Sequence, residues 1–312
     1  SSRSVTGNDK KFSELEKKIS KHKSQESTLV YPTGYMANLG AITAIVEKQN
    51  TIFSDELNHA SIIEACRLSS AKVKIFKHND MDDLESKIKK TNGKKFIVSE
   101  GVFSMDGDLA KIKEITEISS KYDGITILDD AHGDFVFGKD GKGTASQFGV
   151  GRKIDLYISS LSKGLGSFGG YVSSQKNVIE LCINRSKSFI YTSALPSAII
   201  EFTLKRFNSN REKNRKKLWE NIKLLHSGLE EIGYETSSVS QIIPIIIGDE
   251  RTTMKFGKYL FKNGIFAQPI RYPTVKKNSA RIRLSVTAWH TKNDITETLS
   301  ILEKCAKKFR LT

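Results

Sequence analysis

Hydrophobic and polar positions follow two alternating patterns through the first two thirds of the chain. Short runs rich in β-branched and aromatic residues alternate with segments whose apolar residues recur every three or four positions. The strand-like runs cover residues 50–56, 72–78, 94–100, 124–130 and 155–161, and the helical segments between them include 61–70, 81–90 and 109–122. This alternation predicts an α/β fold, in which helices cover a mostly parallel sheet.

The pattern changes near residue 205. Residues 201–233 form a long charged stretch with apolar residues at helical spacing. Strand-like runs at 242–249, 266–273 and 280–288 then alternate with a helical segment at 253–264 and a terminal helix. This order predicts a smaller α+β domain of antiparallel strands with helices on one face. We therefore expect a large α/β domain at residues 1–203 and a small C-terminal domain at 204–312.

Composition adds limits on the class of protein. Of the 312 residues, 38% are hydrophobic and 27% are charged. No apolar run approaches the ~18 residues that would span a bilayer, and the first residues do not resemble a signal peptide. The cysteines Cys66, Cys182 and Cys305 lie far apart without a CxxC pair, which disfavours a disulfide framework or a zinc site. These features favour a cytoplasmic protein with no membrane partner.

The formal net charge of +15 raises the hypothesis of nucleic-acid binding. The lysines, however, are spread over stretches that read as solvated helix faces, such as residues 83–95 and 208–223. No nucleic-acid-binding motif with interleaved aromatic residues accompanies them. The sequence therefore predicts no nucleic-acid partner, and the basic surface instead suits a polyanionic cosubstrate such as coenzyme A.

Chemically active residues gather where the predicted strands end. Ligands of parallel α/β sheets bind beyond the carboxyl ends of the strands. The residues at these ends are Asp55, His59, Glu100, Ser104, Asp129, Asp130, His132, Ser160, Ser162 and Lys163, while Thr33, Gly34 and Tyr35 precede a predicted helix and could cradle a phosphate.

Each of these residues also has an ordinary interpretation. The aspartates could cap helices, His59 could be packed in a core, Lys163 could be a solvated loop charge, and two carboxylates beside a histidine could hold a divalent metal. Their convergence favours pyridoxal phosphate (PLP). Its aldehyde needs an amine, its pyridine nitrogen a carboxylate, its ring a flat partner and its phosphate several donors.

Four motifs carry a resemblance to a known family. "EGVFSMDGD", "LDDAHG", "SLSKGLGSFGGYV" and "ARIRLSVTAWHT" resemble the α-oxoamine synthases, PLP-dependent enzymes with the aspartate-aminotransferase (type I) fold. The similarity covers essentially the whole chain. Family members usually begin several dozen residues upstream of the first residue here, and the missing segment normally carries an asparagine near the substrate carboxylate and part of the acyl-CoA entrance.

The resemblance implies a role for each matching residue. Lys163 would form a Schiff base with PLP, Asp129 would hold the pyridine nitrogen protonated, and His59 would stack on the ring. His132 and Ser104 would contact the ring hydroxyl. The phosphate would be bound by Gly34, Tyr35 and Ser160, the last standing where many relatives have threonine.

Three further residues concern the substrate and a second subunit. Arg283 would pair with the amino-acid carboxylate, and Thr274 would lie near the substrate. Thr192 would reach the phosphate of a neighbouring subunit, which implies a homodimer with shared sites. The alternative for Thr192 is a hydroxyl that caps the following helix.

The implied reaction condenses an acyl-CoA with an amino acid and releases CoA and carbon dioxide. Glu100 and "IRYPTV" at 270–275 are most similar to the members that join a pimeloyl thioester to L-alanine in biotin synthesis. Members that join acetyl-CoA to glycine, or that use another acyl chain, remain the alternative within the family. A basic binding protein that keeps the fold without catalysis is the alternative outside it.

Overall fold

The computed structural model describes residues 1–309 and residue 311, and its contacts divide the chain into two compact units. The first comprises residues 1–103 and 109–211, and the second comprises residues 104–108 and 212–312. The expected limit at residue 203 falls inside helix α9 (Ser197–Asn208). The long helical stretch predicted after residue 200 is two helices, because Ser209 adopts an extended backbone between α9 and α10 (Arg211–Ile232).

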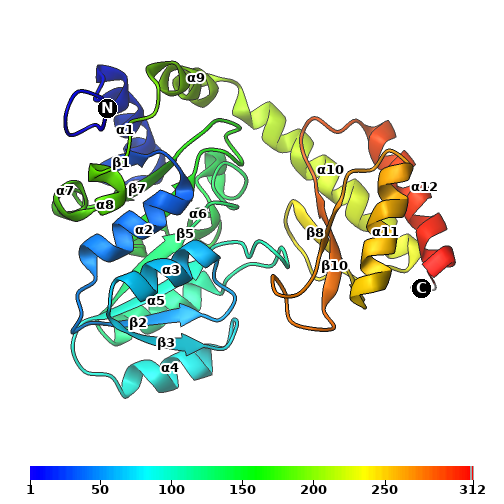
Figure 1. The fold of residues 1–312 in the computed structure, drawn as a ribbon, viewed down its shortest axis with the longest axis horizontal. Coiled ribbons are helices and arrows are strands. Elements are labelled where there is room, and N and C mark those ends of the chain that lie inside the picture. The colour runs from blue at the N-terminus through cyan, green and yellow to red at the C-terminus, as the bar shows by residue number, and fades with distance from the viewer. Residues whose placement is uncertain (310, 312) are drawn as a thin grey trace. The chain divides into compact units, whose positions relative to one another are not determined.

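The first unit contains a seven-stranded sheet in the order β1-β7-β6-β5-β4-β2-β3 (Figure 1). Strands β2 to β6 pair in parallel, whereas β7 pairs antiparallel with both β6 and β1. The strands are β1 (Ser27–Tyr31), β2 (Thr51–Asp55), β3 (Lys72–Phe76), β4 (Lys95–Glu100), β5 (Gly124–Asp129), β6 (Leu156–Ser160) and β7 (Gly170–Ser174). All five strand-like runs of this half are strands, and the mostly parallel sheet is confirmed. The hydrophobic pattern missed β1 and β7, which lie beside serine- and glycine-rich turns.

Helices cover both faces of this sheet. They are α1 (Lys10–Lys23), α2 (Gly34–Ile45), α3 (Ala60–Leu68), α4 (Met81–Lys89), α5 (Ile112–Lys121), α6 (Thr144–Gln147), α7 (Lys176–Arg185), α8 (Lys187–Ile190) and α9. Ile127 of β5 packs in one core with α2, α3 and α7, and its neighbour Leu128 packs in a second core with α4 and α5. Helices α1 and α9 form a third core with Tyr171 of β7. The alternation of side chains along each strand therefore sends neighbouring residues to opposite faces.

The second unit is an α+β arrangement around a three-stranded antiparallel sheet in the order β8-β10-β9 (Figure 1). Its elements are α10, β8 (Ile242–Gly248), α11 (Glu250–Lys262), β9 (Gln268–Ile270), β10 (Ala280–Ser285) and α12 (Lys292–Phe309). Ile282 and Leu284 of β10 pack in one core with apolar residues of all three helices. Arg281 and Arg283 alternate with them and instead bond to residues of the 104–108 segment. The expectation of antiparallel strands with helices on one face is confirmed.

Candidate active site

The two adjacent aspartates at the end of β5 face opposite sides of the sheet. Asp129 lies on the same face of the sheet as Ile127, and the amide of Asn38 on α2 donates to its Oδ2 at 2.6 Å. Asp130 lies on the other face, where the ammonium of Lys23 on α1 approaches its Oδ2 at 3.3 Å. Both carboxylates are buried. Neither is the N-cap residue of a helix, so that alternative is wrong for both aspartates, although Asp130 accepts the backbone N–H of Thr144, the first residue of α6, at 3.1 Å.

Asp129 shares its face with a second buried acid. Glu100 at the end of β4 stands in register with Asp129, and its Oε1 is buried without a hydrogen-bond partner. Burial, together with the nearby Asp129 carboxylate, raises the pKa of Glu100 well above its usual value. The second oxygen of Asp129, Oδ1, accepts the backbone N–H of Ala131 at 3.0 Å. The carboxyl ends of β4 and β5 thus present two acids, one of which has an unsatisfied oxygen.

Lys163 lies in the loop between β6 and β7. Its ammonium nitrogen is 2.8 Å from Nε2 of His132, which follows β5. Lys163 also lowers the pKa of Glu100 and that of His59 through its charge, so it lies within electrostatic reach of both. The loop ends at Gly169, whose φ of +114° is a conformation that favours glycine. The structure therefore brings Lys163, His132 and the acidic edge of the sheet together.

His59 is the N-cap of α3, and its Nδ1 accepts the backbone N–H of Ser61 at 3.2 Å. The hydroxyl of Ser61 lies 2.8 Å from the same nitrogen. Burial, followed in size by the opposing effect of Asp129, lowers the pKa of His59 below its usual value. The residue as a whole is exposed, so one part of the imidazole remains accessible. His59 is thus a helix cap as well as a residue of the acidic edge.

The start of α2 forms a narrow cradle near the same edge. Thr33 caps the helix by accepting the N–H of Met36 at 3.1 Å, and the first N–H groups, those of Gly34 and Tyr35, have no acceptor within a helix. A Cβ on Gly34 would lie 3.1 Å from the Ser160 side chain, and one on Gly170 would lie 2.5 Å from the Gly34 nitrogen. Only glycine at position 170 lets β7 pass so close to the helix. The cradle offers backbone donors, the Ser160 hydroxyl and the positive end of the helix dipole, which together suit an anion.

The opposite face of the sheet carries a closed ionic cluster, defined by His22, Lys23, Asp130, Asp134 and Tyr171. All five are buried. The Lys23 ammonium approaches Asp134 at 3.4 Å and donates to the Lys142 carbonyl at 2.7 Å. Asp134 also accepts from the Tyr171 hydroxyl and is paired with His22. Although burial opposes ionisation, these partners together hold the pKa of Asp134 below its usual value.

Three predicted residues belong to the second unit. The guanidinium of Arg283 donates through Nε to the Ser104 carbonyl at 2.6 Å and through Nη1 to the Ser285 hydroxyl at 2.9 Å. Arg283 also lines a cavity of about 680 Å³ within this unit. Thr274 is exposed in the loop after β9. Ser104 therefore contacts Arg283, whereas no contact between Thr274 and either residue is observed.

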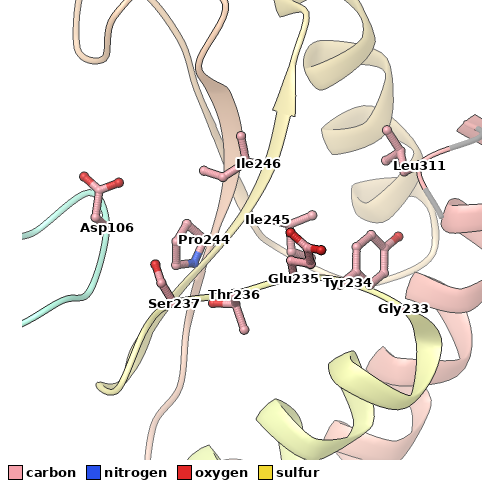
Figure 2. Close-up of a pocket in the computed structure, with 10 residues that line it drawn as sticks. All are labelled: Asp106, Gly233, Tyr234, Glu235, Thr236, Ser237, Pro244, Ile245, Ile246 and Leu311. Carbon is pink, nitrogen blue, oxygen red and sulfur yellow. The ribbon is translucent and has the colours of Figure 1, made fainter.

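A second cavity of the same unit contains none of the predicted residues. It has a volume of about 620 Å³, and Figure 2 shows Asp106, Ser237 and Pro244 among the residues around it. Its lining includes one acid from the 104–108 segment and one, Glu235, from the stretch that follows α10. Nothing in this cavity matches the chemistry predicted from the motifs.

Thr192 lies between α8 and α9 in the first unit. Its hydroxyl is 3.9 Å from the Met36 sulfur on α2. Helix α9 begins at Ser197 with Pro196 as its N-cap, so the helix-cap alternative for Thr192 is wrong. Thr192 therefore stands beside the helix that carries the anion cradle.

The described residues contain neither a cluster of metal ligands nor a membrane-spanning helix. No group of three or more His, Cys, Asp or Glu side chains in residues 1–309 and 311 is arranged to hold a metal ion. Over the same part of the chain, no helix is long and apolar enough to cross a membrane. The three cysteines are free and buried.

The sequence motifs did not identify Asn38 and Ser61 as residues of this site. Both side chains are nearly inaccessible, with exposed fractions of 2% and 1%. Asn38 stands in the mostly apolar segment "GYMANLGAITAI", and an amide in such a helix is costly to bury without a partner. That contrast is the signal that could have identified it.

Comparisons with known proteins identify the family of this chain. The family model for aminotransferase class I and II matches residues 2–302. The chain is 44% identical over 315 aligned residues to an 8-amino-7-oxononanoate synthase of Thermoanaerobacter pseudethanolicus, covering 99% of this chain and 80% of that protein.

Two solved structures extend the comparison. A serine palmitoyltransferase from S. paucimobilis, solved with a bound PLP–myriocin aldimine, superposes with a TM-score of 0.96 at 27% identity, over 100% of this chain and 80% of that one. An 8-amino-7-oxononanoate synthase from Francisella tularensis superposes with a TM-score of 0.84 at 28% identity, over 97% of this chain and 89% of that one. The chain belongs to the aminotransferase class I and II family and, within it, to the α-oxoamine synthases that its motifs predicted.

Proposed function

We propose that the protein is a PLP-dependent C-acyltransferase that condenses a pimeloyl thioester with L-alanine to give 8-amino-7-oxononanoate, CoA and carbon dioxide. The observation that carries the proposal is the convergence of Lys163, His132, His59 and Asp129 at the carboxyl ends of parallel strands. The 44% identity to a synthase of this name supports the choice of reaction.

The residues present fit PLP. The buried oxygens Asn38 Oδ1 and Glu100 Oε1 have no hydrogen-bond partner, which marks a polar cavity edge that a bound group can complete. Asp129 would accept the pyridinium N–H, and the exposed His59 ring would cover one face of the cofactor. The phosphate would lie at the start of α2, against Gly34, Tyr35 and the Ser160 hydroxyl.

When bound, PLP accepts the electron pair released at the amino-acid Cα and so makes that carbon nucleophilic. Lys163 would attach the cofactor covalently and, once displaced by the amino acid, move the Cα proton at its Nζ. His132 lies 2.8 Å from this nitrogen and would orient it and contact the ring hydroxyl. The new carbon–carbon bond forms as the thioester C–S bond breaks, and CoA leaves as its thiol. Loss of carbon dioxide then leaves the aminoketone.

Substrate recognition would fall to residues of the second unit. The Arg283 guanidinium keeps donors beyond its bonds to Ser104 and Ser285, and these would pair with the amino-acid carboxylate. Burial lowers the pKa of Arg283, which still leaves it a cation at neutral pH. Ser104 would additionally contact the cofactor hydroxyl, and Thr274 would lie near the substrate. The basic chain suits the phosphates of acyl-CoA.

The test is a turnover assay on the protein with PLP added, following release of the CoA thiol. We expect a yellow, borohydride-reducible protein and thiol release from pimeloyl-CoA with L-alanine above that from acetyl-CoA with glycine. A preference for acetyl-CoA and glycine would replace the proposed substrates and keep the reaction class. A protein that binds no PLP would instead be a binding protein that keeps the fold, and the proposal would fail.

We further propose a cytoplasmic homodimer with shared sites. The three free cysteines suit a reducing compartment. In a shared site, Thr192 of one subunit would serve the phosphate of the other. A Lys163→Ala subunit mixed with a Thr192→Arg subunit should then regain activity, because one of the two sites keeps both residues. Verified heterodimers no more active than their parents would refute the cross-subunit role of Thr192.

A further inference from the structure

A chain of hydrogen bonds, buried at Asn38, Ser61 and Asp129, links the two residues that would hold the cofactor ring. The Asn38 amide nitrogen donates to Asp129 Oδ2 at 2.6 Å and to the Ser61 hydroxyl at 3.0 Å. The Ser61 hydroxyl in turn lies 2.8 Å from Nδ1 of His59. Asn38 comes from α2, Ser61 from α3 and Asp129 from β5, so the chain joins three elements of the first unit.

The direction of each bond follows from the chemistry of its partners. A carboxylate only accepts, so the Asn38 nitrogen, and not its oxygen, must face Asp129. Nδ1 of His59 already accepts the backbone N–H of Ser61 as the N-cap of α3, and therefore carries no proton. The Ser61 hydroxyl must then donate to Nδ1 and accept from Asn38. The remaining imidazole proton belongs on Nε2.

We propose that Asn38 and Ser61 are positioning residues, which fix the Asp129 carboxylate and hold His59 as a neutral ring with its proton on Nε2. The inference rests on the proposed function, in which these two residues meet PLP. A neutral imidazole stacks on a protonated pyridine ring without charge repulsion. A carboxylate held by an amide keeps its other lone pairs in place for the pyridinium N–H.

Two observations support a role beyond packing. The Asn38 Oδ1 is buried with no hydrogen-bond partner, although its nitrogen makes two bonds. A purely structural amide in an apolar helix would have both ends satisfied. The groups that act on the charge of His59 also favour the neutral ring, because burial, the largest effect, and Lys163 together oppose the Asp129 carboxylate.

The first measurement needs neither cofactor nor turnover. Nitrogen-15 spectra of the histidine-labelled protein report the tautomer of each of its six histidines, and His59→Gln assigns the signal of His59. We expect an unprotonated Nδ1 and a protonated Nε2 in the unaltered protein. A proton on Nδ1 would overturn the proposal without any variant.

Variants then test the two positioning residues. Ser61→Ala should raise the pKa of His59, because the hydroxyl donor to the neutral ring is lost while the backbone N–H of residue 61 still keeps the proton on Nε2, and Ser61→Thr should restore the pKa. Asn38→Ala should weaken PLP binding by about tenfold, the size typical of a lost bond to a charged group. Thr43→Ala is the matched control, because its hydroxyl lies on α2 and bonds only the Leu39 carbonyl of its own helix.

The outcomes separate this inference from the proposed function. If the unaltered protein binds no PLP, the proposed function fails, while the tautomer of His59 still tests the hydrogen-bond chain. If PLP binds normally and both variants leave the His59 spectrum and the PLP affinity equal to those of the Thr43→Ala control, the inference fails and the proposed function stands. Reduced PLP affinity of Asn38→Ala together with altered His59 signals of Ser61→Ala would support both.

Discussion

The two faces of the sheet at the carboxyl end of β5 both carry buried acids, but these acids differ in the partners that surround them. In the ionic cluster, the carboxylates have a lysine, a tyrosine and a histidine as partners. Each carboxylate therefore has a charged or hydrogen-bonding partner within the protein. On the other face, Glu100 has an unbonded oxygen and Asp129 is held by an amide with no net charge. Burial alone therefore does not identify the site. The difference is that the acids of the ionic cluster are satisfied by protein groups, whereas the face of Asp129 and Glu100 lacks a hydrogen-bond donor that a bound ligand could supply.

The largest expected effect separates the two aspartates. Asp129→Asn should lower turnover by roughly a hundredfold or more, the size seen when a group that stabilises developing charge is removed. Asp130→Asn should affect turnover far less, because it faces Lys23 and not the cofactor. Steady-state assays on both PLP-loaded variants check this. Equal losses of turnover in two stably folded variants would mean that the two faces do not differ in function.

Lys23 tests the ionic cluster. Lys23→Met leaves Asp130 and Asp134 buried without their cation, and we expect a loss of about 3–5 kcal/mol in the free energy of unfolding. Urea denaturation of the protein without PLP measures it. Lys21→Met, on the exposed side of the same helix, should change stability by less than about 0.5 kcal/mol. A Lys23→Met loss no larger than that of the control would show that the cluster is not held by this cation.

Two tyrosines on neighbouring strands give a smaller, paired test. Tyr171→Phe removes a hydrogen bond to the Asp134 carboxylate and should cost about 1.5–3 kcal/mol of unfolding free energy. Tyr157→Phe removes a bond to the neutral Gly151 carbonyl and should cost about 0.5–1.5 kcal/mol. Both rings are buried and are retained in the variants. The reverse order of the two losses would argue against an ionised Asp134.

The pH dependence of folding stability tests the environment of Glu100, on the face of the sheet that carries Asp129. Because the pKa of Glu100 is raised in the folded protein, unfolding releases its proton as the pH rises above the ordinary glutamate value of 4.5, and stability falls with pH. Glu100→Gln removes this fall, so the stability of the variant relative to the unaltered protein should rise from pH 5 to pH 8. Urea denaturation without PLP at several pH values measures the trend. Glu114→Gln, on the exposed side of α5, is the control, and parallel curves for the two variants would contradict the raised pKa.

The sequence by itself determined the class of fold and the chemistry at the strand ends. Alternation of strand-like and helical patterns was enough for the parallel sheet, because each pattern reflects a local period of the backbone. The motif "SLSKGLGSFGG" and the aspartate pair identified the family, which the comparisons confirm. The roles of Lys163, His132 and Arg283 remain predictions that the experiments above address.

Only the tertiary structure decided which partner each polar side chain has. Asp129 and Asp130 are neighbours in the sequence, and the pleat sends one to Asn38 on α2 and the other to Lys23 on α1. These partners lie 91 and 107 residues away along the chain, so no local pattern specifies them. Burial and hydrogen bonding depend on such distant neighbours, because they arise only when the sheet assembles. That is the physical reason why the residue pattern could name the acids and the family resemblance could select Asp129, but neither could name the partners that separate it from Asp130.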